Sequence, residues 1–237
     1  MQLWLCPVLA FLLGSIPFGL IIAKAKGINI RDHGSGNIGA TNVLRVIGKK
    51  YGITCLLLDA LKGFIPVLIA VNLIRIAGHH PLLTLSFPDA WTLDLPASEA
   101  LKGQLAHIST ALAAVLGHNY SPWVGFKGGK GIATSAGVFL ALMPMGVAVL
   151  VVVWLLAFLL TRYVSVASIV AAVALPFITI YGSWKHGRIA DGTWNKPLLV
   201  FSILIALLAI WKHRSNIQRL LAGTEHRFTR KAKSTHV

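Results

Sequence analysis

The chain has 237 residues, a length that suits either one large soluble domain or a modest bundle of membrane helices. Apolar residues make up 56% of it and charged residues only 12%, whereas soluble globular proteins carry ~25% charged residues. Lys, Arg, Asp and Glu are all absent from four runs, 1–23, 103–126, 131–161 and 163–184. Because ~20 helical residues cross a hydrocarbon core of ~30 Å, this composition predicts a polytopic membrane protein. It excludes a water-soluble enzyme, a coiled coil and a disordered chain.

The apolar segments that we expect to form helices are, in chain order, 3–24, 52–76, 98–118, 131–161, 164–182 and 197–211. The first has no Lys or Arg before Lys24 and no small-residue cleavage site, so we interpret it as a retained span. The fourth would make a rod of ~46 Å, which is too long for one span. Met143-Pro144-Met145-Gly146 at its middle indicates a turn between two shorter helices.

The distribution of basic residues favours this division of 131–161. With the N-terminus outside, two helices leave 16 Lys and Arg residues inside and 4 outside, whereas one helix leaves 11 inside and 9 outside. Loops on the cytoplasmic side carry the excess of Lys and Arg. We therefore predict an all-α polytopic membrane protein of seven transmembrane helices, several of them short, with the N-terminus outside and the C-terminus cytoplasmic.

The remaining global features are simple. We find no internal repeat, so residues 1–237 are expected to form a single integral-membrane domain, with 226–237 as a flexible basic tail. The net charge of +15 indicates an anionic partner, and composition favours basic inner loops beside anionic lipid over the alternatives, a nucleic-acid patch or a substrate site. Cys6 and Cys55 fall in apolar runs and are expected to pack there, and we expect no metal and no cofactor. The sequence indicates no oligomeric state.

Three segments rich in Gly, Ser, Asn, His and basic residues face the cytoplasm in this topology: 24–50, 118–134 and 211–227. Residues 34–39 match G-x-G-x-x-G, but a dinucleotide site would also need a preceding strand and a βαβ unit. Lys130 does not complete a Walker A motif, because position 124 is Val and position 131 is Gly. Nucleotide binding of either type is therefore not expected.

The second segment instead suggests a phosphate site. Residues 126–131 combine three glycines with Lys127 and Lys130, and a predicted helix follows. Glycines let successive backbone N–H groups point at one anion, and a helix N-terminus adds positive potential. The alternative is a tight turn with lysines that extend toward the interface. In the other two segments, Arg45 offers a planar fork for phosphate oxygens, and His213 and Asn216 share one helix face.

Asp59 and Lys62 lie inside the second predicted span, one helical turn apart. A charge in the membrane costs ~2.5–3.5 kcal/mol on insertion scales, so such groups usually serve function or pair with each other. We interpret them as support for the site, and a self-satisfied ion pair remains the alternative. We find no acid–base dyad, metal cluster or nucleophilic cysteine beside the three polar segments.

These segments resemble the signatures of the bacterial acyl-phosphate:glycerol-3-phosphate acyltransferases, the PlsY family. The first signature corresponds to 14–19 and 31–45, the second to 117–119 and 126–134, and the third to 212–217 with Leu220, Gly223 and Glu225. Residues 59–63 match a further family pattern. The chain departs from the family in its long outer loops, 78–97 and 183–196, and in its basic tail.

The resemblance implies an enzyme of the bacterial inner membrane with its site at the cytoplasmic face. It would transfer an acyl group from acyl-phosphate to the sn-1 hydroxyl of glycerol 3-phosphate, giving lysophosphatidic acid and phosphate. Its partners would be these two substrates, the bilayer and the enzyme that makes acyl-phosphate. The residues expected to carry catalysis are Ser35, Arg45, Lys130, His213 and Asn216. Phosphate contact is expected from Gly34, Gly36, Asn37, Gly39, Thr41, Asn42, Lys127, Gly128, Gly129 and Gly131, with support from Asp59, Lys62, His118 and Glu225.

A transporter for a small organophosphate is the alternative function. It would need polar groups near the middle of the membrane and usually two related halves. Here most charges collect on one face and no repeat is visible.

Overall fold

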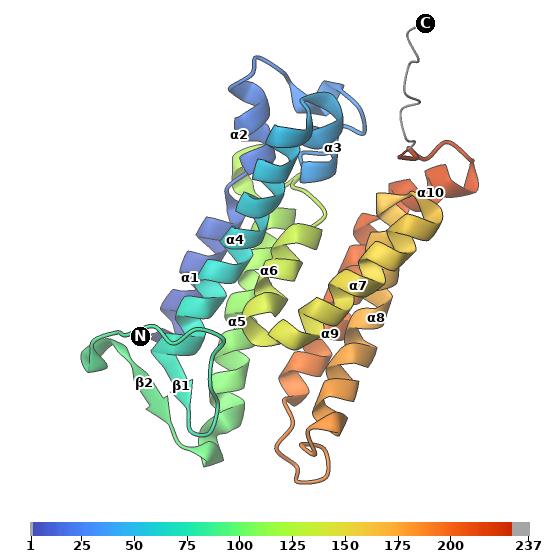
Figure 1. Ribbon diagram of the computed structural model, residues 1–237. Coiled ribbons are helices and arrows are strands. Elements are labelled where there is room, and N and C mark those ends of the chain that lie inside the picture. The colour runs from blue at the N-terminus through green and yellow to red at the C-terminus, as the bar shows by residue number, and fades with distance from the viewer. Residues whose placement is uncertain (1, 229–237) are drawn as a thin grey trace, which may run out of the picture.

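The computed structural model describes residues 2–228. Its helices form two groups (Figure 1), in which α1 packs on α5, α4 packs on α6, and α7 and α9 both pack on α8. The helices are α1 (Gln2–Ser15), α2 (Phe18–Lys24), α3 (Ala40–Val46), α4 (Lys49–Leu73), α5 (Ala100–Asn119), α6 (Ile132–Leu142), α7 (Pro144–Thr161), α8 (Val164–Lys185), α9 (Lys196–Lys212) and α10 (Arg214–Leu221). Short 3₁₀ turns span Ile30–Asp32, Asp89–Trp91, Ala97–Glu99 and Pro122–Val124.

The helices are long and apolar enough for a multi-pass membrane protein. Within residues 2–228, four segments meet the length and hydropathy of a span: Gln2–Lys24, which joins α1 and α2, and the helices α4, α7 and α8. A fifth candidate is α9 with α10, which meet at a bend of 52°. The shorter α6 is also apolar. These features support a polytopic architecture. They account for four or five spans among residues 2–228, fewer than the seven predicted.

Proline sets two of the helix boundaries. The predicted division of 131–161 is confirmed, because α6 ends at Leu142 and α7 begins at Pro144. Proline suits the first turn of a helix, where its missing N–H is not needed. Pro17 interrupts the first predicted span in the same way, between α1 and α2.

The all-α prediction needs one correction. The second span was expected to reach residue 76, but α4 ends at Leu73 and a strand, β1 (Ile74–Ile76), follows. It pairs in parallel with β2 (Leu93–Leu95). Both strands alternate apolar and charged residues, a period that suits a strand with one buried face. Arg75, predicted to lie inside the span, is 3.3 Å from the carboxylate of Asp94.

Glycines allow the helices of the first group to approach closely. A Cβ at Gly14 would lie 2.2 Å from the carbonyl oxygen of Ala114, at the α1–α5 contact. A Cβ at Gly137 would lie 1.9 Å from the carbonyl oxygen of Ala60, at the α4–α6 contact. Close backbone packing through small residues is a main source of association between membrane helices.

Exposed tryptophans mark both ends of the molecule. Trp4, Trp91 and Trp184 are exposed at the end that carries β1 and β2, and Trp123 and Trp211 at the opposite end. Aromatic residues favour both membrane–water interfaces, so this distribution fits a bundle that crosses a bilayer. Most of the predicted tail 226–237 lies outside the described residues. Its described part is held at Phe228, whose backbone N–H donates to the carbonyl of Arg162 at 3.0 Å.

Candidate active site

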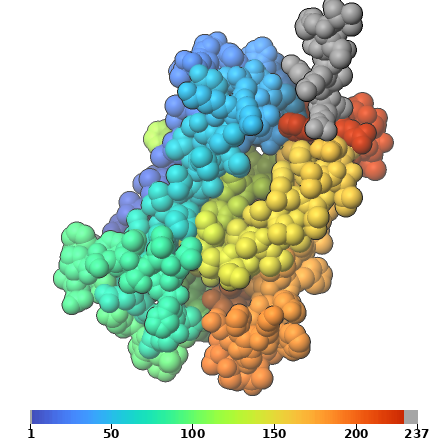
Figure 2. All heavy atoms as spheres, in the orientation of Figure 1, coloured from blue at the N-terminus to red at the C-terminus, as the bar shows by residue number. Residues whose placement is uncertain are grey.

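A cavity of about 410 Å³ lies between the two groups of helices, at the end opposite the strands. The surface is hollowed between α4 and α7, with α6 behind them (Figure 2). Its polar end is formed by α3, the loop before α6, and α10. The deeper walls are apolar and come from α6, α7, α8 and α9, including Phe139, Val147, Leu150, Leu175 and Ile205. The cavity therefore suits an amphiphile with a polar head and an apolar tail.

The first polar segment is organised by Asn42, which is buried at the start of α3. Its side-chain oxygen accepts from the backbone N–H of Ser35 at 2.9 Å, and its amide donates to the carbonyl of Asn37 at 2.9 Å. Gly34 (φ +60°) and Gly36 (φ +66°) make the tight turns that this arrangement needs. Asn42 and these glycines thus shape the loop, whose cavity-lining members are Ser35, Asn37, Gly39, Thr41, Asn42 and Arg45.

The second polar segment holds its two lysines differently. The backbone N–H groups of Gly128 and Gly129 donate to the carbonyls of Asn119 and His118, each at 3.2 Å. The sequence predicted that these N–H groups would point toward an anion. In the structure they donate instead to carbonyls at the end of α5. The side chain of Lys127 is exposed. Lys130 lines the cavity, and its Nζ donates to Oδ1 of Asn216.

Gly131 joins this loop to α6. It has a φ of +83°, and a Cβ there would lie 2.7 Å from the side-chain oxygen of Asn119. Glycine is therefore required both by the backbone conformation and by the space available. Its place before the first residue of α6 directs the N-terminus of that helix toward the cavity.

The third polar segment lies where α9 bends into α10. The Nδ1 atom of His213 is 2.8 Å from the carbonyl oxygen of Ala209, one helical turn back. If Nδ1 donates this bond, Nε2 is the acceptor of the neutral ring. Lys212 anchors the bend, because its Nζ donates to the carbonyl of Asn119 at 3.0 Å.

Glu225 fastens the end of the described chain to this segment. Its Oε1 accepts from Nδ2 of Asn216 at 2.6 Å and from the hydroxyl of Ser165 at 2.8 Å, and its Oε2 accepts from Nε of Arg219 at 2.8 Å. Burial raises the pKa of Glu225, but the hydrogen bonds from Asn216, Ser165 and Arg219 outweigh it and leave that pKa below its ordinary value. The carboxylate is therefore ionised when it holds these groups.

The polar end of the cavity is cationic. Arg45, Lys130 and Arg219 line it together, and the opposing charges of the cavity lining are the carboxylates of Glu225 and Asp59. Burial lowers the pKa of Lys130 to about 8; Glu225 opposes this shift, and the charges of Arg219 and Arg45 add to it. An anionic ligand would favour the charged form of this lysine.

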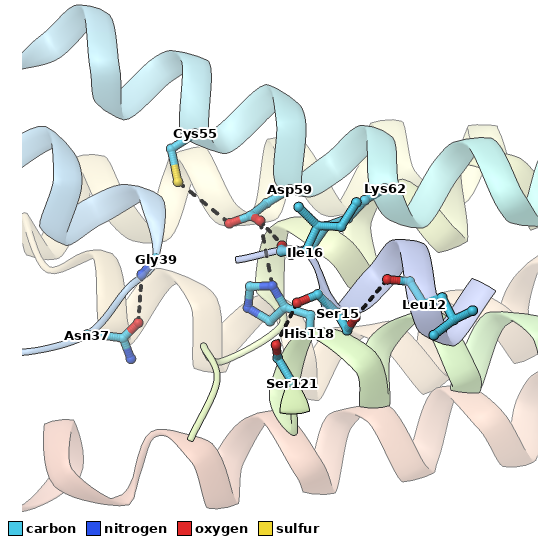
Figure 3. A network of polar contacts seen from close by, with 10 residues as sticks. All are labelled: Leu12, Ser15, Ile16, Asn37, Gly39, Cys55, Asp59, Lys62, His118 and Ser121. Carbon is cyan, nitrogen blue, oxygen red and sulfur yellow. Dashed lines mark hydrogen bonds and ion pairs between the residues drawn. The ribbon is translucent and has the colours of Figure 1, made fainter. Parts of the chain in front are cut away.

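Asp59, Lys62 and His118 form a buried polar cluster beneath the second segment (Figure 3). The Nζ of Lys62 is 2.8 Å from Oδ1 of Asp59, so the ion pair considered from the sequence is present. Asp59 and His118 also line the cavity.

The structure thus brings most predicted site residues to one cavity. The exceptions are Gly34, Gly36, Lys62, Lys127, Gly128 and Gly129, which do not line it. Sequence reasoning missed Ser165, Ser168 and His226, and it noted Arg219 only as a basic group of the third segment, although all four line the cavity. A serine in an apolar run directly after Arg162 was the available signal for Ser165. Among residues 2–228, no group of three or more His, Cys, Asp or Glu side chains could hold a metal ion.

Comparison with known proteins gives consistent matches along the chain. The family model for glycerol-3-phosphate acyltransferase matches residues 4–223. The glycerol-3-phosphate acyltransferase of Aquifex aeolicus is 45% identical over 222 residues, which cover 93% of this chain and 96% of that protein. The protein of the same name from Geobacter metallireducens is 47% identical over 219 residues, covering 92% and 94%.

Solved structures agree with these relatives. The crystal structure of PlsY, an integral membrane glycerol 3-phosphate acyltransferase, in its glycerol 3-phosphate form superposes with a TM-score of 0.77. It is 41% identical, and the alignment covers 97% of this chain and 96% of that one. The lysophosphatidic acid form of PlsY gives a TM-score of 0.74 over the same coverage.

Proposed function

This chain belongs to the glycerol-3-phosphate acyltransferase family, and from that membership we propose that its acyl donor is an acyl-phosphate. It is a membrane-bound acyltransferase that acts on glycerol 3-phosphate, with lysophosphatidic acid as the product. The proposed reaction acylates the sn-1 hydroxyl and releases inorganic phosphate. Family membership favours this enzyme over the organophosphate transporter that the sequence left open.

One observation carries the proposal: a cluster of cations lies at the mouth of an apolar cavity. Arg45, Lys130 and Arg219 outnumber the two carboxylates of the lining, Glu225 and Asp59, and Asp59 is itself paired with Lys62. Two phosphorylated molecules, the donor head and glycerol 3-phosphate, would suit such a cluster. Along α8 the lining changes from Ser165 to Leu175, ten residues or ~15 Å deeper, so an acyl tail would extend between the helices toward Leu175.

The cluster supports catalysis by alignment and charge neutralisation. Acyl-phosphate is a mixed anhydride, so its carbonyl carbon is already electrophilic and phosphate is a good leaving group. The glycerol hydroxyl oxygen would form the new ester bond to that carbon while the bond from the carbonyl carbon to the phosphate oxygen breaks. Arg45 and Lys130 would neutralise the charge that develops on the departing phosphate.

The hydroxyl proton needs an acceptor, and we propose that a phosphate oxygen of the donor takes it, so that it leaves with inorganic phosphate. His213 is the rival acceptor, because its Nε2 is available when Nδ1 is bonded to Ala209. Single-turnover acyl transfer by His213→Ala separates the two. We expect weaker substrate binding and a chemical step within about tenfold of wild type, because a general base contributes typically 10²–10⁴-fold. A loss of that larger size at saturating substrate would identify His213 as the base.

We also propose the orientation of the protein. Seven spans would be formed by α1 with α2, then α4, α5, α6, α7, α8 and α9, with α10 at the cytoplasmic face. The N-terminus would lie outside, and the cationic cluster would face the cytoplasm of the bacterial inner membrane. The excess of basic residues at the cluster's end supports this orientation. The donor would then come from an acyl-phosphate-producing enzyme on the same side.

The experiment that tests the function follows phosphate release by purified protein in detergent. We expect phosphate release from acyl-phosphate only when glycerol 3-phosphate is present, with one lysophosphatidic acid formed per phosphate. Acyl-phosphate could be replaced by an acyl thioester as a control for donor class. Equal turnover with the thioester, or release without glycerol 3-phosphate, would contradict the proposed donor or the proposed coupling.

A further inference from the structure

A polar cluster lies buried between the middle of α4, the end of α5 and the junction of α1 and α2, directly beneath the loop that carries Lys130. Asp59 is 2%, Lys62 6% and His118 5% exposed. Lys62 is 2.8 Å from Asp59, and its Nζ also donates to the carbonyl of Ile16 at 2.6 Å. The ion pair therefore connects α4 to the junction of α1 and α2 (Figure 3). Charges inside a membrane protein are costly to insert, so a cluster at this depth calls for a role.

His118 lies next to the ion pair, at the end of α5. Its Nδ1 is 3.6 Å from Oδ1 of Asp59, which is ion-pair distance, and it has no hydrogen-bond partner within residues 2–228. The ring and the carboxylate thus face each other, and both side chains are buried. The position of Asp59 is itself set by Lys62, so the cluster limits how the His118 ring can turn.

The other edge of the His118 ring supports the glycine–lysine loop. A Cβ at Gly129 would lie 2.2 Å from Nε2 of His118, so the backbone of Gly129 rests directly on the ring. A Cβ at Gly128 would lie 2.0 Å from the carbonyl oxygen of His118. The N–H of Gly129 donates to that same carbonyl. The next residue is Lys130, whose amine enters the cavity.

We propose that His118, held by the Asp59–Lys62 ion pair, is a positioning residue that sets the location of the Lys130 amine through direct packing against Gly129. The inference rests on the proposed function, because that function gives Lys130 its phosphate. It assigns a purpose to the buried ion pair: Asp59 and Lys62 hold the His118 ring, against which the loop packs. A positioning error of about 1 Å in a site of this kind can cost ~10²-fold in rate.

A double-mutant cycle tests the proposal, with His118→Ala and Lys130→Ala made singly and together. Two residues that act as one unit give non-additive losses, whereas independent residues multiply. We expect His118→Ala to raise the KM for glycerol 3-phosphate at least tenfold in the wild-type background. In the Lys130→Ala background it should change that KM by less than twofold. Equal fold losses in both backgrounds would overturn the proposal and indicate that His118 contacts substrate itself.

His107→Ala is the matched control on the same helix. His107 is partly buried in α5, but its Nε2 lies 2.8 Å from the carbonyl oxygen of Ile74, at the far end from Lys130. This variant should lower thermal stability and leave the KM for glycerol 3-phosphate unchanged. An equal rise in KM from His107→Ala would mean that any damage to α5 produces the effect, and the proposal would fall.

Gly129→Ala approaches the same contact from the loop and is used if His118→Ala does not fold. Its methyl group would displace the loop from the ring while Asp59, Lys62 and His118 all remain in place. We expect the same rise in KM, and a folded Gly129→Ala protein with wild-type KM would overturn the proposal. Binding of glycerol 3-phosphate without donor is measured in parallel. Wild-type protein that binds glycerol 3-phosphate but transfers no acyl group from acyl-phosphate contradicts the proposed donor. In that case the double-mutant cycle is evaluated from the dissociation constants of glycerol 3-phosphate instead of its KM.

Discussion

Lys127 and Lys130 are three residues apart in one glycine-rich loop, yet the fold gives them different surroundings. Lys127 is exposed, and its backbone carbonyl accepts from Arg31 at 2.8 Å. Lys130 lines the cavity and binds Asn216. The sequence grouped both as phosphate ligands because spacing alone cannot state which side of a turn faces inward. We infer from their places that Lys130 is the one that binds substrate.

Alanine substitution at each lysine measures this difference. Hydrogen bonds to charged groups contribute about 1.5–3 kcal/mol, which corresponds to ~10–100-fold in binding. We therefore expect Lys130→Ala to lower kcat/KM for glycerol 3-phosphate at least tenfold, and Lys127→Ala to lower it less than threefold. Steady-state kinetics on folded protein decide the matter. Similar losses of kcat/KM from both variants would show that Lys127 also binds substrate.

The pH dependence of binding should report Lys130 as well. Burial lowers its pKa to about 8, so the free protein loses this charge as the pH rises through 8. A phosphate monoester has its second pKa near 6, so the substrate keeps its charge over this range. The KM for glycerol 3-phosphate should therefore be flat from pH 7 to 7.5 and rise above pH 8, by about tenfold per unit at most. A profile that keeps the same rise in Lys130→Ala would assign it to another group.

At the residue scale, the sequence predicted chemistry better than geometry. Arg45, Lys130, His213 and Asn216 lie at one cavity, as the three polar segments indicated. Asn42 was expected to touch phosphate, but its side chain is used by the backbone of its own loop. Ser165 was missed because it lies in an apolar run, and its place at the cavity and its bond to Glu225, 60 residues away, appear only in the fold. Contacts of this kind depend on the tertiary fold, which no local pattern contains.

At the scale of elements, the boundaries that proline sets were predictable and those that tertiary pairing sets were not. Pro144 divides 131–161 because proline removes a backbone donor, a local effect. The strand β1 forms only because β2, about 20 residues later, returns to pair with it. An Ile-Arg-Ile sequence after an apolar helix gives no local sign of that return, so it was predicted as the end of the helix.

The close contact of α4 and α6 also positions the site, because α6 follows Lys130 directly. A methyl group at Gly137 would meet the carbonyl of Ala60, and overpacking of this kind costs about 1–3 kcal/mol. We expect Gly137→Ala to lower the unfolding temperature in detergent and to reduce activity. A thiol-reactive dye can follow the unfolding, since Cys6 and Cys55 are both buried.

Gly182→Ala is the control for that prediction. Gly182 lies in α8 and has no atom within 4 Å of an added Cβ, so the substitution should leave the unfolding temperature unchanged or slightly higher. A Gly137→Ala protein as stable as Gly182→Ala would show that α4 and α6 can separate without cost, and that their contact does not hold the loop in place.

At the scale of the whole molecule, the two ends differ in charge and in structure. One end carries α3, the loop before α6, and α10, which together form the cationic part of the cavity. The other end carries β1, β2 and the loop between α8 and α9. In β1, Arg75 lies near Asp89 and near Asp94 of β2. The fold therefore brings together the segments that the charge count had put on one side.

Labelling of single cysteines from each side of the membrane tests that orientation. With Cys6 and Cys55 replaced by Ala, reporters at exposed positions would be Lys50→Cys, Lys127→Cys and Arg214→Cys at the cationic end, and Trp91→Cys and Ile189→Cys at the other. An impermeant thiol reagent added to intact spheroplasts should label only Trp91→Cys and Ile189→Cys, because anionic lipid and the membrane potential retain basic loops inside. Reaction of all three cationic-end positions from outside would invert the orientation while leaving the site intact. A split among those three would be more damaging, because α3, the glycine–lysine loop and α10 could then not enclose one cavity, and the two-phosphate site would lose its physical basis.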